Sequence, residues 1–152
     1  MRHITLTILS TISILSATVI NVPGDYTTIQ AGINASVEGD TVLVAQGNYV
    51  ENLILEKEIV LASHAIYDDL DSEWFNNEHI SSTRIMGGNP SNSKKGSCIQ
   101  VSYGNIQPTI MGFTISQGLG TSVMVEDCGI TRIERSGGAI IAFQAYPVIA
   151  HN

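Results

Sequence analysis

Ile85-Met86-Gly87 and Ile110-Met111-Gly112 are copies of one triplet placed 25 positions apart, and the same interval again reaches Gly137-Gly138. Short apolar pairs fill the stretches between these points and alternate with corners of Gly, Asn, Ser and Pro. A helical repeat would need about ten or more periodic residues in each element, and these stretches are too short. Each repeat unit is therefore predicted to consist of short strands joined by turns.

Such a unit cannot bury its apolar face alone, whereas stacking it on its neighbour buries a continuous core. Backbone hydrogen bonds would then run between coils about 4.8 Å apart. The pattern therefore predicts an all-β fold, a parallel β-helix of roughly four to five coils. In this arrangement Gly87, Gly112 and Gly137 are expected to lie in one column. The pattern is still running at residues 146–152, which predicts further coils of the same chain.

One short amphipathic helix is predicted before the repeat, over residues 27–37. Thr27 and Gln30 have the spacing of a capping box, and Gly39 follows the helix as a terminating residue. The apolar residues of this helix recur at every fourth position: Ile29, Ile33 and Val37. Because the first coil of a solenoid leaves an open core, we expect this stripe to cover it as an N-terminal cap. Strands are predicted nearby at 19–22, 41–45, 53–55 and 59–62, with a turn at 46–48.

Composition supports one folded domain and excludes several classes of protein. The 152 residues are 43% apolar and 14% charged, which is enough for a core. Seven basic residues stand against 14 acidic ones, a net charge of −7, which argues against a nucleic-acid partner. Fourteen glycines and few aromatic residues favour short strands with tight corners over a helical bundle.

The N-terminus has the layout of a secretory signal peptide over residues 1–17. A basic start, Met1-Arg2-His3, precedes an apolar run at 4–15 and the small pair Ser16-Ala17. The alternative is a buried first strand. With the signal interpretation, residues 18–152 form the cap and first coils of a secreted or cell-surface protein. The apolar run is too short and too rich in hydroxyl groups for a membrane span, and no other segment resembles one.

The two cysteines, Cys98 and Cys128, would be able to form a disulfide outside the cytosol. The alternative is that they are two buried small apolar residues on different strands. Both interpretations place them within the repeat region.

Residues 64–80 interrupt the repeat and are predicted to form an insertion at a corner of a coil. Asp69, Asp71 and Glu73 carry the oxygen ligands that Ca²⁺ prefers, and no other cofactor is expected. Trp74 and Phe75 are candidates for stacking on a sugar ring. The alternative is a solvated acidic loop whose two rings pack on the coil. His64 and His79 flank the insertion and would be close if it folds back like a hairpin.

Glu126-Asp127 is the one adjacent pair of acids outside the predicted loops, and paired carboxylates are what polygalacturonase-like hydrolysis requires. The alternative is a solvated turn with a surface ion pair to Arg132. No Ser/His/Asp or zinc-ligand spacing accompanies any of the four histidines.

Two sets of residues resemble exported right-handed parallel β-helix proteins of the pectin-lyase-like superfamily. The first resembles their N-terminal segment, and comprises Val22-Pro23-Gly24-Asp25-Tyr26-Thr27-Thr28-Ile29-Gln30, Gly39-Asp40-Thr41-Val42-Leu43-Val44-Ala45 and Gly47-x-Tyr49-x-Glu51-Asn52. The second is similar to their middle coils, and comprises Ile110-Met111-Gly112-Phe113-Thr114-Ile115, Gly137-Gly138-Ala139-Ile140 and Pro147-Val148-Ile149.

This resemblance implies a right-handed parallel β-helix but leaves the activity open, because the superfamily includes lyases, esterases, polygalacturonases, adhesins and non-catalytic surface proteins. The catalytic Asp and Gln motifs of pectin methylesterases are absent from residues 112–132, so no catalytic residue is assigned. We therefore expect a non-catalytic protein that presents an elongated surface to polysaccharide. The alternatives are the N-terminal part of a carbohydrate-active enzyme whose site lies beyond residue 152, and a structural stalk or adhesin.

Overall fold

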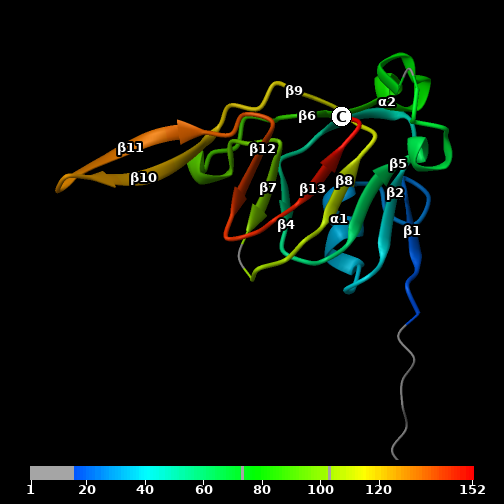
Figure 1. The fold of residues 1–152 in the computed structure, drawn as a ribbon, viewed down its shortest axis with the longest axis horizontal. Helices are drawn as coiled ribbons and strands as arrows, with labels where there is room; N and C mark the ends of the chain where they lie inside the picture. Colours follow the sequence, from blue (N-terminus) through cyan, green and yellow to red (C-terminus); the bar gives the residue numbers. More distant parts are fainter. Residues whose placement is uncertain (1–15, 73, 103) are drawn as a thin grey trace, which may run out of the picture.

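The computed structural model describes residues 16–72, 74–102 and 104–152 (Figure 1). The predicted signal peptide therefore lies almost wholly outside the described residues. The described chain consists mainly of short strands with a few short helices, and its sheets are parallel except for one hairpin. An all-β fold with parallel sheets agrees with the prediction. No helix in these three ranges is both long and apolar enough to cross a membrane.

Three parallel sheets form the body of the molecule. The largest pairs its strands in the order β1 (Val19–Val22), β2 (Thr41–Val44), β5 (Val60–Ser63), β8 (Thr109–Met111) and β13 (Val148–Ala150). The second pairs β3 (Gly47–Val50), β6 (Thr83–Met86) and β9 (Thr114–Ser116). The third pairs β4 (Leu53–Leu55), β7 (Ile99–Ser102) and β12 (Ile140–Phe143).

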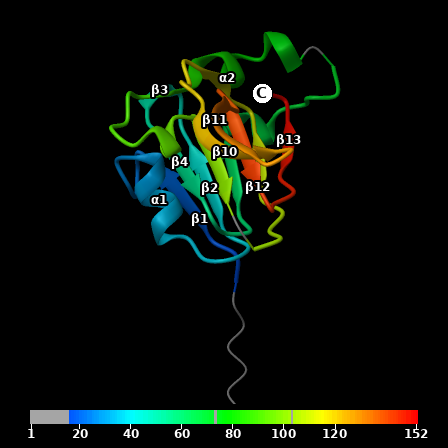
Figure 2. The ribbon, with the colours of Figure 1, turned by 90° about the vertical axis from the view of Figure 1, so that its left-hand side faces the viewer.

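The chain visits these sheets in a fixed cyclic order. It runs from β2 to β3 to β4 and returns to the first sheet at β5, and β5 to β8 follows the same cycle. After β8 and β9 the cycle is completed by β12 and β13. We call one full cycle through the three sheets a pass, and each pass adds one strand to every sheet. The strands of a sheet therefore lie side by side in Figures 1 and 2 although they are distant in sequence.

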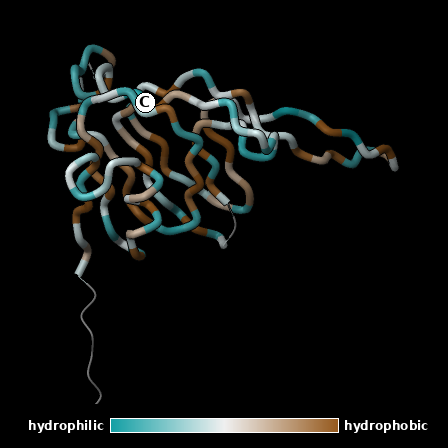
Figure 3. The backbone as a smooth tube through the Cα atoms, turned by 180° about the vertical axis from the view of Figure 1, so that it is seen from behind, coloured by the Kyte–Doolittle hydropathy of each residue, from teal (hydrophilic) through white to brown (hydrophobic). Residues whose placement is uncertain are grey.

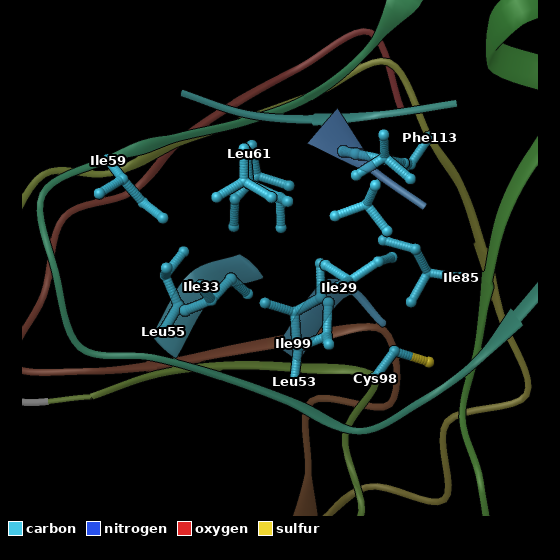
Figure 4. Close-up of a cluster of buried hydrophobic side chains, with 14 of the residues drawn as sticks. Ile29, Ile33, Leu53, Leu55, Ile59, Leu61, Ile85, Cys98, Ile99 and Phe113 are labelled. Carbon is cyan, nitrogen blue, oxygen red and sulfur yellow. The ribbon is translucent and has the colours of Figure 1, made fainter. Parts of the chain in front are cut away.

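The core lies inside the three sheets. Val42, Leu61 and Ile110 are register neighbours in the five-stranded sheet, and none has exposed surface. Figure 4 shows Leu61, Ile85 and Ile99, one from each sheet, pointing into the same cluster while the chain wraps around them. Figure 3 shows the same division along the chain, with apolar strand segments in the body and polar loops around it. Alternation of inward and outward residues along short strands explains this burial.

The predicted 25-residue column of glycines is wrong. In the five-stranded sheet Thr41 lies beside Val60, 19 positions later, and Val60 lies beside Thr109, 49 positions later. Gly87 follows β6, Gly112 follows β8 and Gly137 follows the hairpin, so the three lie at different corners. The passes differ in length because loops leave the body between strands. Backbone pairing between strands therefore sets the register, and a constant repeat length does not.

Close approach of backbones explains why Gly87 is required. A Cβ placed there would come within 2.7 Å of the Gln117 carbonyl oxygen and of the Gly118 Cα. Gly87 therefore stacks on the following pass at Gln117 and Gly118. The predicted turn at 46–48 is also wrong, because Gly47 and Asn48 belong to β3 and pair with β6.

The predicted helix exists but is shorter than expected, as α1 (Ile29–Ala35). Thr28 is the N-cap, since its Oγ1 accepts a hydrogen bond from the Ala31 amide (3.2 Å). Thr27 therefore does not cap the helix, and Val37 is exposed beyond its end. The buried face consists of Ile29, Gly32 and Ile33, which lie against β1, β2 and β4.

Three side chains attach α1 to the body. The Glu51 carboxylate accepts hydrogen bonds from the amides of Ile29 (2.9 Å) and Gln30 (3.0 Å), the first free donors of the helix. The Gln30 side chain accepts from the Ile54 amide (2.7 Å) and donates to its carbonyl oxygen (3.1 Å), as a neighbouring strand would. Lys57 Nζ donates to the carbonyl oxygens of Ile33, Asn34 and Ser36 at the helix end.

Two segments leave the body between strands. The first is the predicted insertion, which contains η1 (His64–Tyr67), η2 (Trp74–Asn76) and α2 (Glu78–Ser82). The second follows β9 and forms an antiparallel hairpin of β10 (Thr121–Asp127) and β11 (Ile130–Ser136), which projects away from the sheets (Figure 1). The hairpin was not predicted, since the 25-residue interval assigned this stretch to parallel coils. The turn η3 (Ser93–Lys95) lies beside β10.

The attachment of α1 predicts that Glu51→Ala lowers the free energy of unfolding by about 2 kcal/mol, because two backbone donors lose a charged acceptor. Glu56→Ala is the matched control, since Glu56 is exposed and its carboxylate makes no hydrogen bond among the described residues. Urea unfolding of both variants measures the difference. Equal stability of the two variants would contradict this role for Glu51.

The buried column predicts that Leu61→Ala lowers the free energy of unfolding by about 3 kcal/mol, because it leaves a cavity in a packed core. Ile149 stands in the same column at the edge strand β13 and is half exposed. Ile149→Ala is therefore expected to cost less than about 1 kcal/mol. Thermal or urea unfolding compares the two, and a larger loss for Ile149→Ala would be inconsistent with the core described above.

Candidate functional site

The insertion is held against β5, β6 and β9 by its own caps and one buried anchor. Ser63 Oγ accepts a hydrogen bond from the Ala65 amide (3.1 Å) where η1 begins. Asn77 Oδ1 accepts one from the Ile80 amide (3.1 Å) where α2 begins. Ile80 is buried, and its carbonyl oxygen accepts from Thr114 Oγ1 (2.9 Å). The insertion, with α2, lies near the C-terminal end of the chain in Figure 1, and the Trp74 ring contacts that of His151 there.

Six rings form two groups on the insertion and at His151. His64 lies near Tyr67 and His79, and Trp74 lies near Phe75 and His151; we refer to the two groups together as the ring cluster. The ring centroids of Trp74 and Phe75 are 6.4 Å apart with an interplanar angle of 83°, the edge-to-face geometry that aromatic pairs prefer. His64 is 6.0 Å from His79, so the predicted proximity of these two histidines is confirmed. The cluster therefore combines aromatic faces with imidazole nitrogens.

The aromatic rings of the cluster are open to solvent. Tyr67 is 70% exposed and Phe75 is 68% exposed, while Trp74, which lies between Phe75 and His151, is 38% exposed. The predicted alternative, in which Trp74 and Phe75 pack flat on a coil, therefore does not describe Phe75. Trp74 and Phe75 therefore both keep part of their surface open to solvent.

Asp68 fixes the polar side of the cluster. Its Oδ2 accepts hydrogen bonds from His79 Nδ1 (2.7 Å) and from Asn77 Nδ2 (2.8 Å). Because a carboxylate only accepts, Nδ1 of His79 carries the proton and Nε2 faces away from Asp68. The hydrogen bonds from His79 and Asn77 lower the pKa of Asp68 below its ordinary value of 3.8. Asp68 is therefore a fixed negative charge at neutral pH.

Sequence reasoning did not identify His151 as part of this site. Its ring lies 5.7 Å from Trp74, although the two residues are far apart in the chain. The Nδ1 atom of His151 is buried without a hydrogen-bond partner among the described residues. His151 reaches the insertion because β13 pairs with β8 in the observed register. The incorrect 25-residue interval did not predict that register.

The predicted calcium ligands are not brought together as a described site. Asp69 and Asp71 are exposed, and the Asp71 amide donates to Asp69 Oδ1 (3.1 Å) within the loop. Glu73 lies outside the described residues. Within the described ranges, no group of three or more His, Cys, Asp and Glu side chains is placed to hold a metal ion. The calcium assignment stays a prediction.

The two cysteines are free and lie in different parts of the molecule. Cys98 is buried, its Sγ donates to the Ser116 carbonyl oxygen (3.0 Å), and burial raises the pKa of its thiol. Cys128 is exposed in the two-residue turn between β10 and β11. The predicted disulfide is not formed in this structure, because the hairpin carries Cys128 away from the core.

The adjacent acids Glu126 and Asp127 lie on the outer part of the hairpin and are exposed. Arg132 Nε forms an ion pair with Glu134 Oε1 (2.5 Å) instead of with either acid. The hairpin therefore presents these acids to solvent, as the alternative interpretation expected, although the partner of Arg132 is a different acid.

The Asp68–His79 pair resembles the orienting half of a nucleophilic triad, which would also need a hydroxyl or thiol at His79 Nε2. No such hydrogen bond occurs in the described part of the chain. The cluster as described can stack on an apolar face and exchange hydrogen bonds at its edge. Comparison of the sequence with models of protein families and with curated proteins finds no match.

Trp74 is the single tryptophan of the chain, so its fluorescence reports on the ring cluster. Since the pKa of Asp68 is lowered in the folded state, its stabilising effect is complete above 3.8 and is lost as the pH falls through the lowered value. We expect the Trp74 emission to stay constant down to about pH 4 and to shift to longer wavelength below it.

Asp68→Ala is expected to show the shifted emission already at neutral pH, because Asn77 and His79 lose their shared acceptor. Asp71→Ala is the control, since its carboxylate accepts no hydrogen bond among the described residues. An emission spectrum of Asp68→Ala that matches the unsubstituted protein at pH 7 would contradict the proposed role of Asp68.

Proposed function

We propose that this chain is a segment of an exported right-handed parallel β-helix protein that binds a neutral polysaccharide at the ring cluster. The cyclic order in which the chain visits its three parallel sheets supports the β-helix, because each coil of such a fold contributes one strand to each sheet. The attachment of α1 through Glu51, Gln30 and Lys57 supports its role as the N-terminal cap.

The observation that carries the binding function is the exposure of three aromatic rings within one insertion. A sugar ring presents a flat face of C–H groups, which packs on an aromatic ring while its hydroxyl groups remain hydrogen-bonded at the edge. Tyr67, Trp74 and Phe75 supply the faces. Asp68 uses only Oδ2 for its two protein contacts, so Oδ1 is available to a sugar hydroxyl.

Charge favours a neutral polysaccharide over a polyuronate. The insertion carries five acids, and the chain as a whole has a net charge of −7; the acids are Asp68, Asp69, Asp71, Glu73 and Glu78. Repulsion between these acids and the carboxylates of a polyuronate weakens binding at low ionic strength.

The test is affinity electrophoresis of the protein in gels that contain neutral polysaccharides or polygalacturonate, followed by calorimetry on any polymer that retards it. Trp74→Ala and Phe75→Ala are each expected to weaken binding about five- to tenfold, because a stacked ring contributes about 1 kcal/mol. The control is Tyr26→Ala, which removes an exposed ring outside the insertion.

We expect a neutral polymer to retard the protein. This retardation should be lost in Trp74→Ala and kept in Tyr26→Ala. Unchanged mobility on every neutral polymer would end the proposal, and so would equal weakening by Tyr26→Ala.

A further inference from the structure

A second site lies at the base of the hairpin, and it does not depend on the function proposed for the ring cluster. A cavity of about 380 Å³ opens where β10 passes η3, above β7 and β12. Its size falls at the lower end of the range found for small-molecule sites. The hairpin and η3 both lie outside the cyclic pattern of strands, so core packing alone does not account for this cavity.

One polar group of the cavity wall lacks a hydrogen-bond partner among the described residues. Gln100 Nε2 donates to Ser102 Oγ (2.9 Å), while Gln100 Oε1 is buried without a hydrogen bond among the described residues. Exchanging the amide oxygen and nitrogen would pair the oxygen with the Ser102 hydroxyl and leave the nitrogen unpaired instead. In both orientations one amide group of Gln100 needs a partner, and buried groups of this kind normally have one. A hydroxyl group fits both orientations, since it donates and accepts.

Lys94 supplies the charge. Lys94 is one of the residues that line the same cavity, and no carboxylate lies within ion-pair distance of its ammonium group among the described residues. In a chain with twice as many acidic as basic residues, an unpaired cation at a cavity selects an anion. Lysine binds an anion as a point charge with three rotatable donors, and a carboxylate meets that requirement.

The rest of the wall is partly apolar, and Ser93, Thr121 and Ser122 add hydroxyl groups to it. Phe143 and Val123 line the cavity, and the cross-strand pair Met124 and Ile133 continues it to the solvent. Met124 is 71% exposed and Ile133 is 73% exposed. A flat aromatic ring suits these walls, because phenyl, aliphatic and thioether groups all pack on its faces or edges.

We infer that this cavity binds a phenolic carboxylate. The carboxylate lies at Lys94, the phenolic hydroxyl pairs with the Gln100 amide, and the aromatic ring packs between Phe143 and the Met124–Ile133 pair. This assignment uses Lys94, the Gln100 amide and the apolar residues named above.

Isothermal titration with 4-hydroxycinnamate tests the inference directly. We expect one site per chain, with binding that weakens as salt rises because Lys94 is exposed. Cinnamate, which lacks the hydroxyl, and 4-hydroxycinnamyl alcohol, which lacks the carboxylate, should each bind about tenfold more weakly.

Three variants distinguish binding in this cavity from binding elsewhere on the surface. Lys94→Gln should weaken binding of 4-hydroxycinnamate about tenfold, while Lys95→Gln, a neighbour outside the cavity wall, should leave it unchanged. Gln100→Leu should remove the advantage of 4-hydroxycinnamate over cinnamate without weakening cinnamate. Trp74→Ala should have no effect on this binding, which distinguishes the cavity from the ring cluster.

The absence of heat at millimolar 4-hydroxycinnamate would overturn the inference. Equal weakening by Lys94→Gln and Lys95→Gln would overturn it as well. Tighter binding of galacturonate than of 4-hydroxycinnamate would reassign the cavity to acidic sugars.

Discussion

The amide groups of a parallel strand need partners on both sides, and the strands at the end of a stack have a neighbour on one side only. In this chain β1 and β4 stand at such an end of their sheets. Helix α1 lies against both strands and buries Ile29 and Ile33 over the core. The Gln30 amide then pairs with both backbone groups of Ile54, so one side chain replaces part of a missing strand. Glu51 accepts hydrogen bonds from free amides at the start of the helix, and Lys57 donates to free carbonyl oxygens at its end. All the residues that hold the helix in place therefore belong to the pass that the helix covers.

The same backbone pairing allows the chain to leave the body and return in register. The insertion lengthens the pass between β5 and β8, and the hairpin lengthens the pass between β9 and β12, yet the strands that follow pair as before. Loop closure becomes only slightly less favourable as a loop grows, so such excursions are tolerated. Both candidate sites lie on them. The ring cluster lies on the insertion, and the cavity with Lys94 and Gln100 lies at the base of the hairpin.

Local chemistry made part of this predictable from the sequence. The strands at 19–22 and 53–55, the insertion and the proximity of His64 to His79 all follow from residues close together in the chain. The hairpin was missed because its turn, Cys128-Gly129, lacks the usual Asn-Gly or Asp-Gly signature, although both residues have the positive φ that such a turn requires. Glu51 and His151 were missed as partners of α1 and Trp74, because their roles depend on register between distant strands. Register depends on which strands pair. The repeated Ile-Met-Gly triplet suggested a 25-residue interval that the paired strands do not follow.

Cross-strand nuclear Overhauser effects in the five-stranded sheet test the central claim most directly. Parallel pairing in the observed register places Ile20, Val42, Leu61, Ile110 and Ile149 in one column across β1, β2, β5, β8 and β13. The amide and Hα protons of successive members should therefore show the contacts of parallel pairing. Contacts that instead join positions 25 apart, or the close Hα–Hα contacts of antiparallel pairing in these strands, would contradict the structure and both sites built on it.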